Sequence, residues 1–420
     1  MKRSSLLSCL LCSLPLLAQT TAGTPLTLEQ AVAEAISNNL DLAAERYNVS
    51  VARARETTAG LRPNPVATLS GMTLNTFGTT FSSDRPLGPN QFNAHTDFIM
   101  ERNGKRAKRV EVAQADRGLA EFGVREVMRQ VAYNVQSSFV TVQQSKANLM
   151  LAQDNLQSLR GIVDINEARV RSGDLAPVEL ERSRIAALTY ETGVQRAQLA
   201  LDQAKSQLQL LLGRRAHDAN FDVSGDIRRE TLTQTPETIR TLALQQRPDV
   251  LGTQSTQARN QSDLRLQLAN GKADLTLGAE YTYQRAYGIG GSTLGFSVAM
   301  PLMIFNKNQG EIARAQQQIR QSQSRLEALQ ATLDTEVDLA YRQYDSSQRL
   351  LTNIETNMLA RARSVRDTTE YSYRRGEATL VEFLDAQRAF NETTQAYNDA
   401  RADVARSLYL IDSVTASSIK

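Results

Sequence analysis

The sequence predicts a mainly α-helical chain with a small β part, arranged as an internal tandem repeat. Residues 311–375 contain neither glycine nor proline over 65 positions. A helix of that length extends roughly 100 Å, far more than a helix of an average globular domain. Two further regions, 65–101 and 273–303, replace the helical period with the alternation typical of strands. The order of these features occurs twice, 208 positions apart near the start of each unit and 203 positions apart near its end.

The composition argues against a nucleic-acid-binding protein and against a large globular core. The 420 residues carry a formal net charge of only +3, which gives no electrostatic basis for binding nucleic acid. Aromatic residues make up 5% of the chain and tryptophan is absent, so we do not expect a large spherical core.

Residues 1–22 are predicted to be a secretory signal peptide. Two basic residues precede an apolar run over 6–17, and cleavage is plausible after Ala18 or Ala22. Both cysteines lie in this segment, so the mature chain has no thiol; a lipoprotein anchored at Cys9 is the alternative. No later apolar run reaches 18 residues, so any entry of the mature chain into a membrane must use strands.

The first structural repeat covers residues 23–225. A capping-box pattern, Thr27 to Gln30, starts its first helix, and Gly173 breaks the helical pattern near its end. In order, we expect a helix over 27–59, a hairpin over 65–101, a very long helix over 104–172 and a helix over 177–212.

The second structural repeat covers residues 226–420 and follows the same plan. Thr235 precedes its first helix as Thr27 precedes that of the first repeat, and Gly376 matches Gly173. In order, we expect a helix from 235, a hairpin over 273–303, a single helix over 311–375 and a final helix.

The two hairpins have the length and pattern of an outer-membrane barrel wall. Their strands are about ten residues long and alternate apolar with polar side chains. A half-exposed soluble sheet shows the same alternation. In lipid, however, four strands cannot close a barrel and an open edge leaves backbone groups unpaired, so the chain must oligomerise. Two copies supply eight strands; three supply twelve, enough for a water-filled lumen.

Several local signatures occur in order along the mature chain. They are Leu-Thr-Leu-Glu-Gln-Ala at 26–31, Asn-Gly-Lys-Arg at 103–106, Phe-Asn-Lys-Asn-Gln-Gly at 305–310 and the turns at 171–174 and 374–377. Together they resemble one known family, the TolC-like outer-membrane efflux factors of tripartite pumps. The resemblance covers essentially the whole mature chain and is greatest with the heavy-metal RND efflux branch.

This resemblance implies a homotrimer in the outer membrane. Its four strands per chain would form a twelve-stranded transmembrane β-barrel, and its long antiparallel helices a periplasmic α-barrel about 100 Å deep. It also implies a periplasmic adaptor protein and an inner-membrane RND-type pump, which dock at the closed end. Such a protein is a passive exit duct for small molecules or heavy-metal cations. The alternatives are the channel of a type I protein secretion system and a soluble periplasmic coiled-coil scaffold.

The resemblance assigns two groups of site residues to the periplasmic tip. The tip turns, where the adaptor docks, comprise Gly173, Asp174, Arg375, Gly376 and Glu377. The periplasmic gate comprises Glu179, Glu382, Asp385 and Tyr373. In a trimer each gate carboxylate forms a ring of three like charges, which raises its pKa and attracts cations.

Two observations weaken this gate assignment. Glu382 is also the N3 residue of a capping box that begins at Thr379, so capping of its own helix is an alternative to the gate role. Arg182 stands where the repeat mate, Asp385, is acidic, which removes one carboxylate per chain.

Nothing in the sequence indicates an enzyme. The only two histidines, His95 in an expected strand and His217 in a linker, cannot supply a metal triad or a histidine acid–base pair. No glycine-rich phosphate loop follows a strand. We therefore expect no catalytic residue, no cofactor and no metal site.

Overall fold

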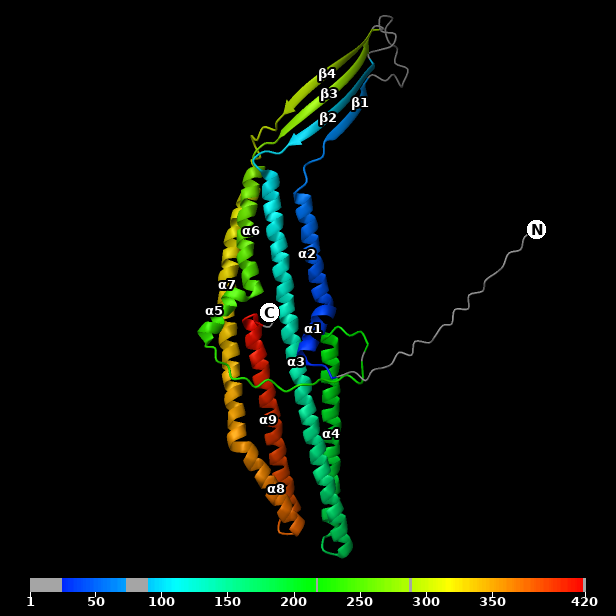
Figure 1. The fold of residues 1–420 in the computed structure, drawn as a ribbon, viewed down its shortest axis with the longest axis vertical. Coiled ribbons are helices and arrows are strands. Elements are labelled where there is room, and N and C mark those ends of the chain that lie inside the picture. Colours follow the sequence, from blue (N-terminus) through cyan, green and yellow to red (C-terminus); the bar gives the residue numbers. More distant parts are fainter. Residues whose placement is uncertain (1–24, 73–89, 217, 287–288, 418–420) are drawn as a thin grey trace, which may run out of the picture.

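The protein is seen in a computed structural model that describes residues 25–72, 90–216, 218–286 and 289–417. Its helices lie along one long axis, and the sheet extends beyond one end of them (Figure 1). In chain order the elements are α1 (Leu28–Asn38), α2 (Leu40–Ala59), β1 (Val66–Met72), β2 (Asn90–Met100), α3 (Lys105–Ser172), α4 (Pro177–Leu211), α5 (Pro236–Gln246), α6 (Pro248–Asn270), β3 (Leu275–Ala286), β4 (Ile289–Ala299), α7 (Gln309–Asn353), the π-helical turn η1 (Ile354–Met358), α8 (Leu359–Arg375) and α9 (Leu380–Val414). The mainly helical fold with four strands is confirmed. The predicted signal peptide over 1–22, with both cysteines, lies outside the described residues.

Both halves have the expected order of elements, but the first helix of each half is divided. Asn39 separates α1 from α2 with extended backbone angles, φ −65° and ψ 123°, and its side chain accepts a hydrogen bond from the Leu42 amide at 2.9 Å. Arg247 takes nearly the same angles between α5 and α6, where the following Pro248 disfavours helical backbone at the preceding residue. The expectation of one continuous helix over 27–59 was therefore wrong at one residue.

The expected single helix over 311–375 is helical throughout but is not a single α-helix. The π-helical turn η1 separates α7 from α8, and Ile354 at its start is buried. Such turns commonly accompany a change of helix direction, and the rod bends between α7 and α8 in Figure 1. Both segments pack along α9, so the turn lies where the rod changes course to follow its partner.

The core consists of seams between neighbouring helices instead of one globular interior. One cluster of buried aliphatic side chains lies among α5, α6, α7 and α9, and a second lies among α1, α3 and α4. This is how narrow apolar stripes on long helices are buried. Among the helices of the described residues, none is both long enough and apolar enough to cross a lipid bilayer.

The four strands form one antiparallel sheet in the order β1-β2-β3-β4. Leu69, Ala94, Tyr281 and Leu294 form a cross-strand row on the apolar face. This face is open to the surroundings: Phe296, for example, is 80% exposed. The expected alternation is therefore confirmed, and Figure 1 shows the sheet standing clear of the helices. The part of the first expected strand that follows residue 72 lies outside the described residues.

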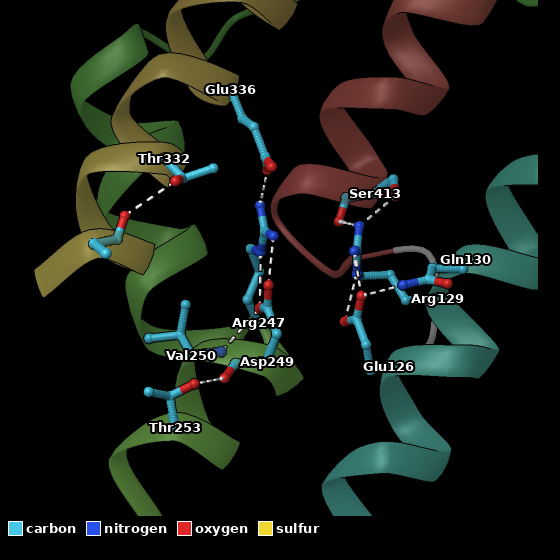
Figure 2. Close-up of polar contacts among 11 residues, drawn as sticks. Glu126, Arg129, Gln130, Arg247, Asp249, Val250, Thr253, Thr332, Glu336 and Ser413 are labelled. Atoms are coloured by element: carbon cyan, nitrogen blue, oxygen red, sulfur yellow. Dashed lines mark hydrogen bonds and ion pairs between the residues drawn. The ribbon is translucent and has the colours of Figure 1, made fainter. Parts of the chain in front are cut away.

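A set of ion pairs joins the helices near mid-length (Figure 2). Arg247, only 3% exposed, binds Asp249 through two hydrogen bonds of 3.0 and 2.6 Å, and it also pairs with Glu336 of α7. Arg129 of α3 binds the Ser413 hydroxyl at 2.8 Å, near the end of α9. These contacts connect α6 to α7 and α3 to α9 across long sequence separations.

Candidate functional site

The two tip turns lie at the end of the molecule opposite the sheet (Figure 1). Gly173 and Gly376 both have φ of +81°, a left-handed conformation that favours glycine. The amides of the following residues, Asp174 and Glu377, lie 2.8 and 2.9 Å from carbonyl oxygens five residues earlier. Both long helical rods therefore end in the same hydrogen-bonded glycine cap.

The charged side chains of the tip turns are exposed. Asp174 accepts a hydrogen bond from the Ser172 hydroxyl at 2.8 Å. Arg375 lies 3.3 Å from Glu377 and donates to the Tyr371 hydroxyl at 2.8 Å. These contacts are all local, so the turns present their charged side chains to the surroundings.

Tyr373 connects two hairpins at the tip. Its hydroxyl donates to Asn166 Oδ1 of α3 at 2.7 Å, and both side chains are buried. Its ring stacks on Phe383 of α9 with centroids 5.8 Å apart. Burial raises the pKa of the Tyr373 phenol, so it remains a neutral donor. Tyr373 therefore joins α8 to α3 through a buried hydrogen bond set in an apolar cluster.

Arg169 and Glu179 complete the surroundings of Tyr373. Arg169 of α3 donates to the Tyr373 carbonyl at 3.4 Å, and its Nη2 lies where a side chain on Gly376 would begin, 2.6 Å from the ideal Cβ position. Glu179 forms an ion pair of 2.7 Å with Arg182, and its negative charge makes a minor contribution to the raised pKa of Tyr373. Within the described residues Tyr373 contacts Asn166, Arg169 and Phe383, and Glu179 forms no hydrogen bond with it.

Glu382 and Asp385 lie elsewhere, on the exposed face of α9. Glu382 accepts from the Thr379 amide at 2.7 Å and the Thr379 hydroxyl at 3.0 Å, which completes a capping box. These hydrogen bonds lower the pKa of the Glu382 carboxyl. Asp385 faces solvent, 3.7 Å from Arg388. Within one chain Glu382 therefore caps its helix. The rings of like charge that the gate carboxylates would form between three chains stay a prediction.

Sequence reasoning missed the buried amides that accompany this site. Besides the Asn166 contact with Tyr373 of α8, buried amides join α3 to α9: Gln387 Nε2 donates to Asn155 Oδ1 at 2.7 Å, and Asn155 also bonds Asn391. Buried amides in a helix seam fix the register of the two helices. These buried amides could have been found in the sequence as polar residues at positions of the helical repeat where the buried face is otherwise apolar.

Comparison with known proteins identifies the family. The sequence model described as "Outer membrane efflux protein" matches residues 31–214 and 239–415, most of the chain and in two segments. The chain belongs to this family. It is therefore an outer-membrane efflux channel that extends into the periplasm, and the family comprises transport channels, not enzymes.

Individual relatives are distant but similar along their full length. The cobalt-zinc-cadmium resistance protein CzcC of Cupriavidus metallidurans is 24% identical over 392 residues, which cover 91% of this chain and 88% of CzcC. A crystal structure of CusC has a TM-score of 0.74 at 18% identity, covering 92% of this chain and 91% of CusC. The open-state MtrE outer membrane channel of Neisseria gonorrhoeae has a TM-score of 0.74 at 13% identity, covering 94% and 89%. These comparisons do not favour the secretion-channel or soluble-scaffold alternatives.

Proposed function

We propose that this chain forms one third of a passive trimeric exit duct for small molecules or heavy-metal cations. The observation that carries the trimer is the exposed apolar face of an open four-stranded sheet. In the described part of the chain β1 and β4 are the two edge strands of the sheet, and an open sheet edge is costly in lipid. Pairing β1 of each copy with β4 of the next closes twelve strands around a water-filled lumen.

The opposite, polar face of the sheet suits the passage of cations. His95 lies 2.9 Å from Asp97 and 4.0 Å from Glu280 on the neighbouring strand. Gly278 provides the room, because a Cβ there would come within 2.9 Å of the His95 ring. In the described part of the chain no group of three such side chains is placed to hold a metal ion. A weak contact of this kind attracts cations without retaining them, and CzcC is named for cobalt, zinc and cadmium resistance.

The tip is proposed as the gate and the docking end. Channels of this family work with a periplasmic adaptor and an inner-membrane pump. The exposed tip turns supply the surface for the adaptor. The buried Tyr373–Asn166 bond supplies the closure, because the α8–α9 hairpin can move away from α3 only by breaking it. Glu179, Glu382 and Asp385 then line the opening as charge rings.

Export from intact cells tests this function. Cells that lack the gene should accumulate Cd²⁺ or Zn²⁺ and recover when the gene is restored. The purified mature protein should migrate as a heat-modifiable trimer and conduct ions in planar bilayers. A defect in polypeptide secretion with unchanged metal content would instead favour a type I secretion channel. A monomer recovered in the aqueous fraction would refute the duct.

A further inference from the structure

A band of positive charge lies where the sheet meets the helices. Its members are exposed or half-buried cations from four chain segments that converge there. We call the following set the basic band: Arg62, Arg102, Arg106, Lys108, Lys272 and Lys307. Over the described ranges, none of these six side chains forms an ion pair with a carboxylate.

The carboxylates at this level are already neutralised by other cations. Asp274 binds the buried Lys105 ammonium at 2.8 Å. Burial acts to raise the pKa of Asp274, but hydrogen bonds from Lys105 and from the Arg102 amide, with the nearby positive charge, lower it. Glu101 is paired with Arg109 through both of its oxygens. Neither carboxylate forms an ion pair with a member of the basic band, so the positive charge of the band attracts anions.

A groove joins this charge to the apolar face of the sheet. It has a volume of about 640 Å³ and is lined by the segment 62–65, the end of β2, Arg106 and Leu277. Phe98 and Leu277 form its apolar side and are 51% and 42% exposed. Arg62 and Arg106 form its cationic rim. Among the described residues Arg106 makes one hydrogen bond, from its Nε to the Gly60 carbonyl, which leaves its two terminal nitrogens for a ligand.

We propose that this boundary groove binds an anionic phospholipid of the periplasmic leaflet. Arg62 and Arg106 hold the phosphate, and an acyl chain lies along Phe98 and Leu277. The inference rests on the proposed function, because it requires the strands to cross the outer membrane with their apolar face toward lipid. It goes beyond that function by naming the lipid class and the residues that select it.

The juxtaposition of charge and apolar surface identifies a lipid as the occupant. A free phosphate would satisfy the two arginines but would leave Phe98 and Leu277 in water. A phospholipid places its charged headgroup at the edge of the hydrocarbon layer. The apolar face of β2 reaches the same level at its C-terminal end, where Phe98 lies beside the two arginines. Leu302 and Phe305, 74% and 90% exposed, extend the apolar surface beside the band.

Lipid retention by the purified mature protein tests the site. The wild type and the double variant Arg62→Gln/Arg106→Gln are equilibrated with mixed micelles of phosphatidylglycerol or phosphatidylcholine, and bound lipid is counted by native mass spectrometry. Each basic residue near an anionic surface contributes about fivefold, so the double variant should bind phosphatidylglycerol roughly 30-fold more weakly. Arg320→Gln/Arg325→Gln is the matched control, because both residues are exposed on α7 and make no ion pair in the described chain.

Four results would overturn the proposal. The first is that the double variant retains as much phosphatidylglycerol as the wild type, and the second is that the wild type binds phosphatidylcholine as tightly as phosphatidylglycerol. The third is that inorganic phosphate binds as tightly as phosphatidylglycerol. The fourth is that the double variant loses the trimer but keeps the same amount of bound lipid per chain. The last result would assign the groove to a contact between copies. Conductance in planar bilayers separates this inference from the proposed function: a conducting protein that retains no phosphatidylglycerol refutes the site alone, whereas a lipid-binding monomer refutes the duct.

Discussion

Replacing Tyr373 with phenylalanine should loosen the closed tip. The substitution removes one hydroxyl and keeps the ring that stacks on Phe383. It leaves Asn166 Oδ1 without its donor in a site where the Asn166 side chain is 0% exposed. Asn166 Nδ2 already has no partner in the described chain, so the amide would be left entirely unsatisfied. An unpaired buried polar group of this kind costs about 1–3 kcal/mol.

That cost falls on the closed state, because an open tip exposes Asn166 to water. The ratio of open to closed channels should therefore rise by about 5- to 150-fold. The assay is single-channel recording of the reconstituted trimer, with open probability and conductance measured at several voltages. Tyr371→Phe is the control. Tyr371 lies about half a helical turn from Tyr373 and is 58% exposed, and among the described residues its hydroxyl accepts one hydrogen bond, from Arg375 in the same tip turn.

A second substitution separates the hydrogen bond from general damage. Asn166→Leu combined with Tyr373→Phe replaces both partners with apolar groups, which is close to neutral for a buried pair. The double variant should therefore close again. If Tyr373→Phe conducts like the wild type, or if the double variant is more open than the single one, the buried bond does not hold the tip shut.

Three further predictions follow from the tip and the mid-length ion pairs. Glu382→Ala should destabilise α9, because it removes the carboxylate that accepts from the Thr379 amide, whereas Glu382→Gln retains the capping box. A rise in conductance in Glu179→Gln/Glu382→Gln would therefore report charge alone, and unchanged conductance removes both residues from the gate. Gly376→Ala should lower the midpoint of thermal unfolding more than Gly173→Ala does. Both glycines have φ of +81°, but only a Cβ on residue 376 would lie 2.6 Å from the Arg169 guanidinium. Equal shifts of the two midpoints would show that backbone strain alone matters. Burial acts to raise the pKa of Asp249, but the hydrogen bonds and charge of its buried partner Arg247 contribute to a net lowering of that pKa. The stability that ionised Asp249 contributes is therefore present above its unfolded-state pKa near 3.8, and it is lost as the pH falls through the lower pKa of the folded state. The midpoint difference between wild type and Asp249→Asn should accordingly shrink below about pH 4, and a constant difference would contradict this linkage.

The boundaries of the elements and the two turns could be predicted because their signals are local. The capping boxes at Thr27 and Thr379, the left-handed glycines at 173 and 376, and the alternation along the strands each depend on residues within a few positions. The π-helical turn had no such signal. Asn39 did carry one, because asparagine is a preferred N-cap residue and its side chain accepts from the Leu42 amide, but no proline follows it as Pro248 follows Arg247, and the predicted continuous helix overlooked it.

The amino-acid order thus specified a duplicated set of long helices and amphipathic hairpins, together with the positions of the turns. The folded arrangement alone specified which side chains meet. Tyr373 and Asn166 are 207 residues apart, and the partners Arg247 and Glu336 are 89 apart. Periodicity identifies the face of a helix that is buried but not the helix that buries it. Whether two residues on different helices come into contact depends on how far the helices are shifted along the bundle axis relative to each other. That shift is set only when all the helix seams pack together.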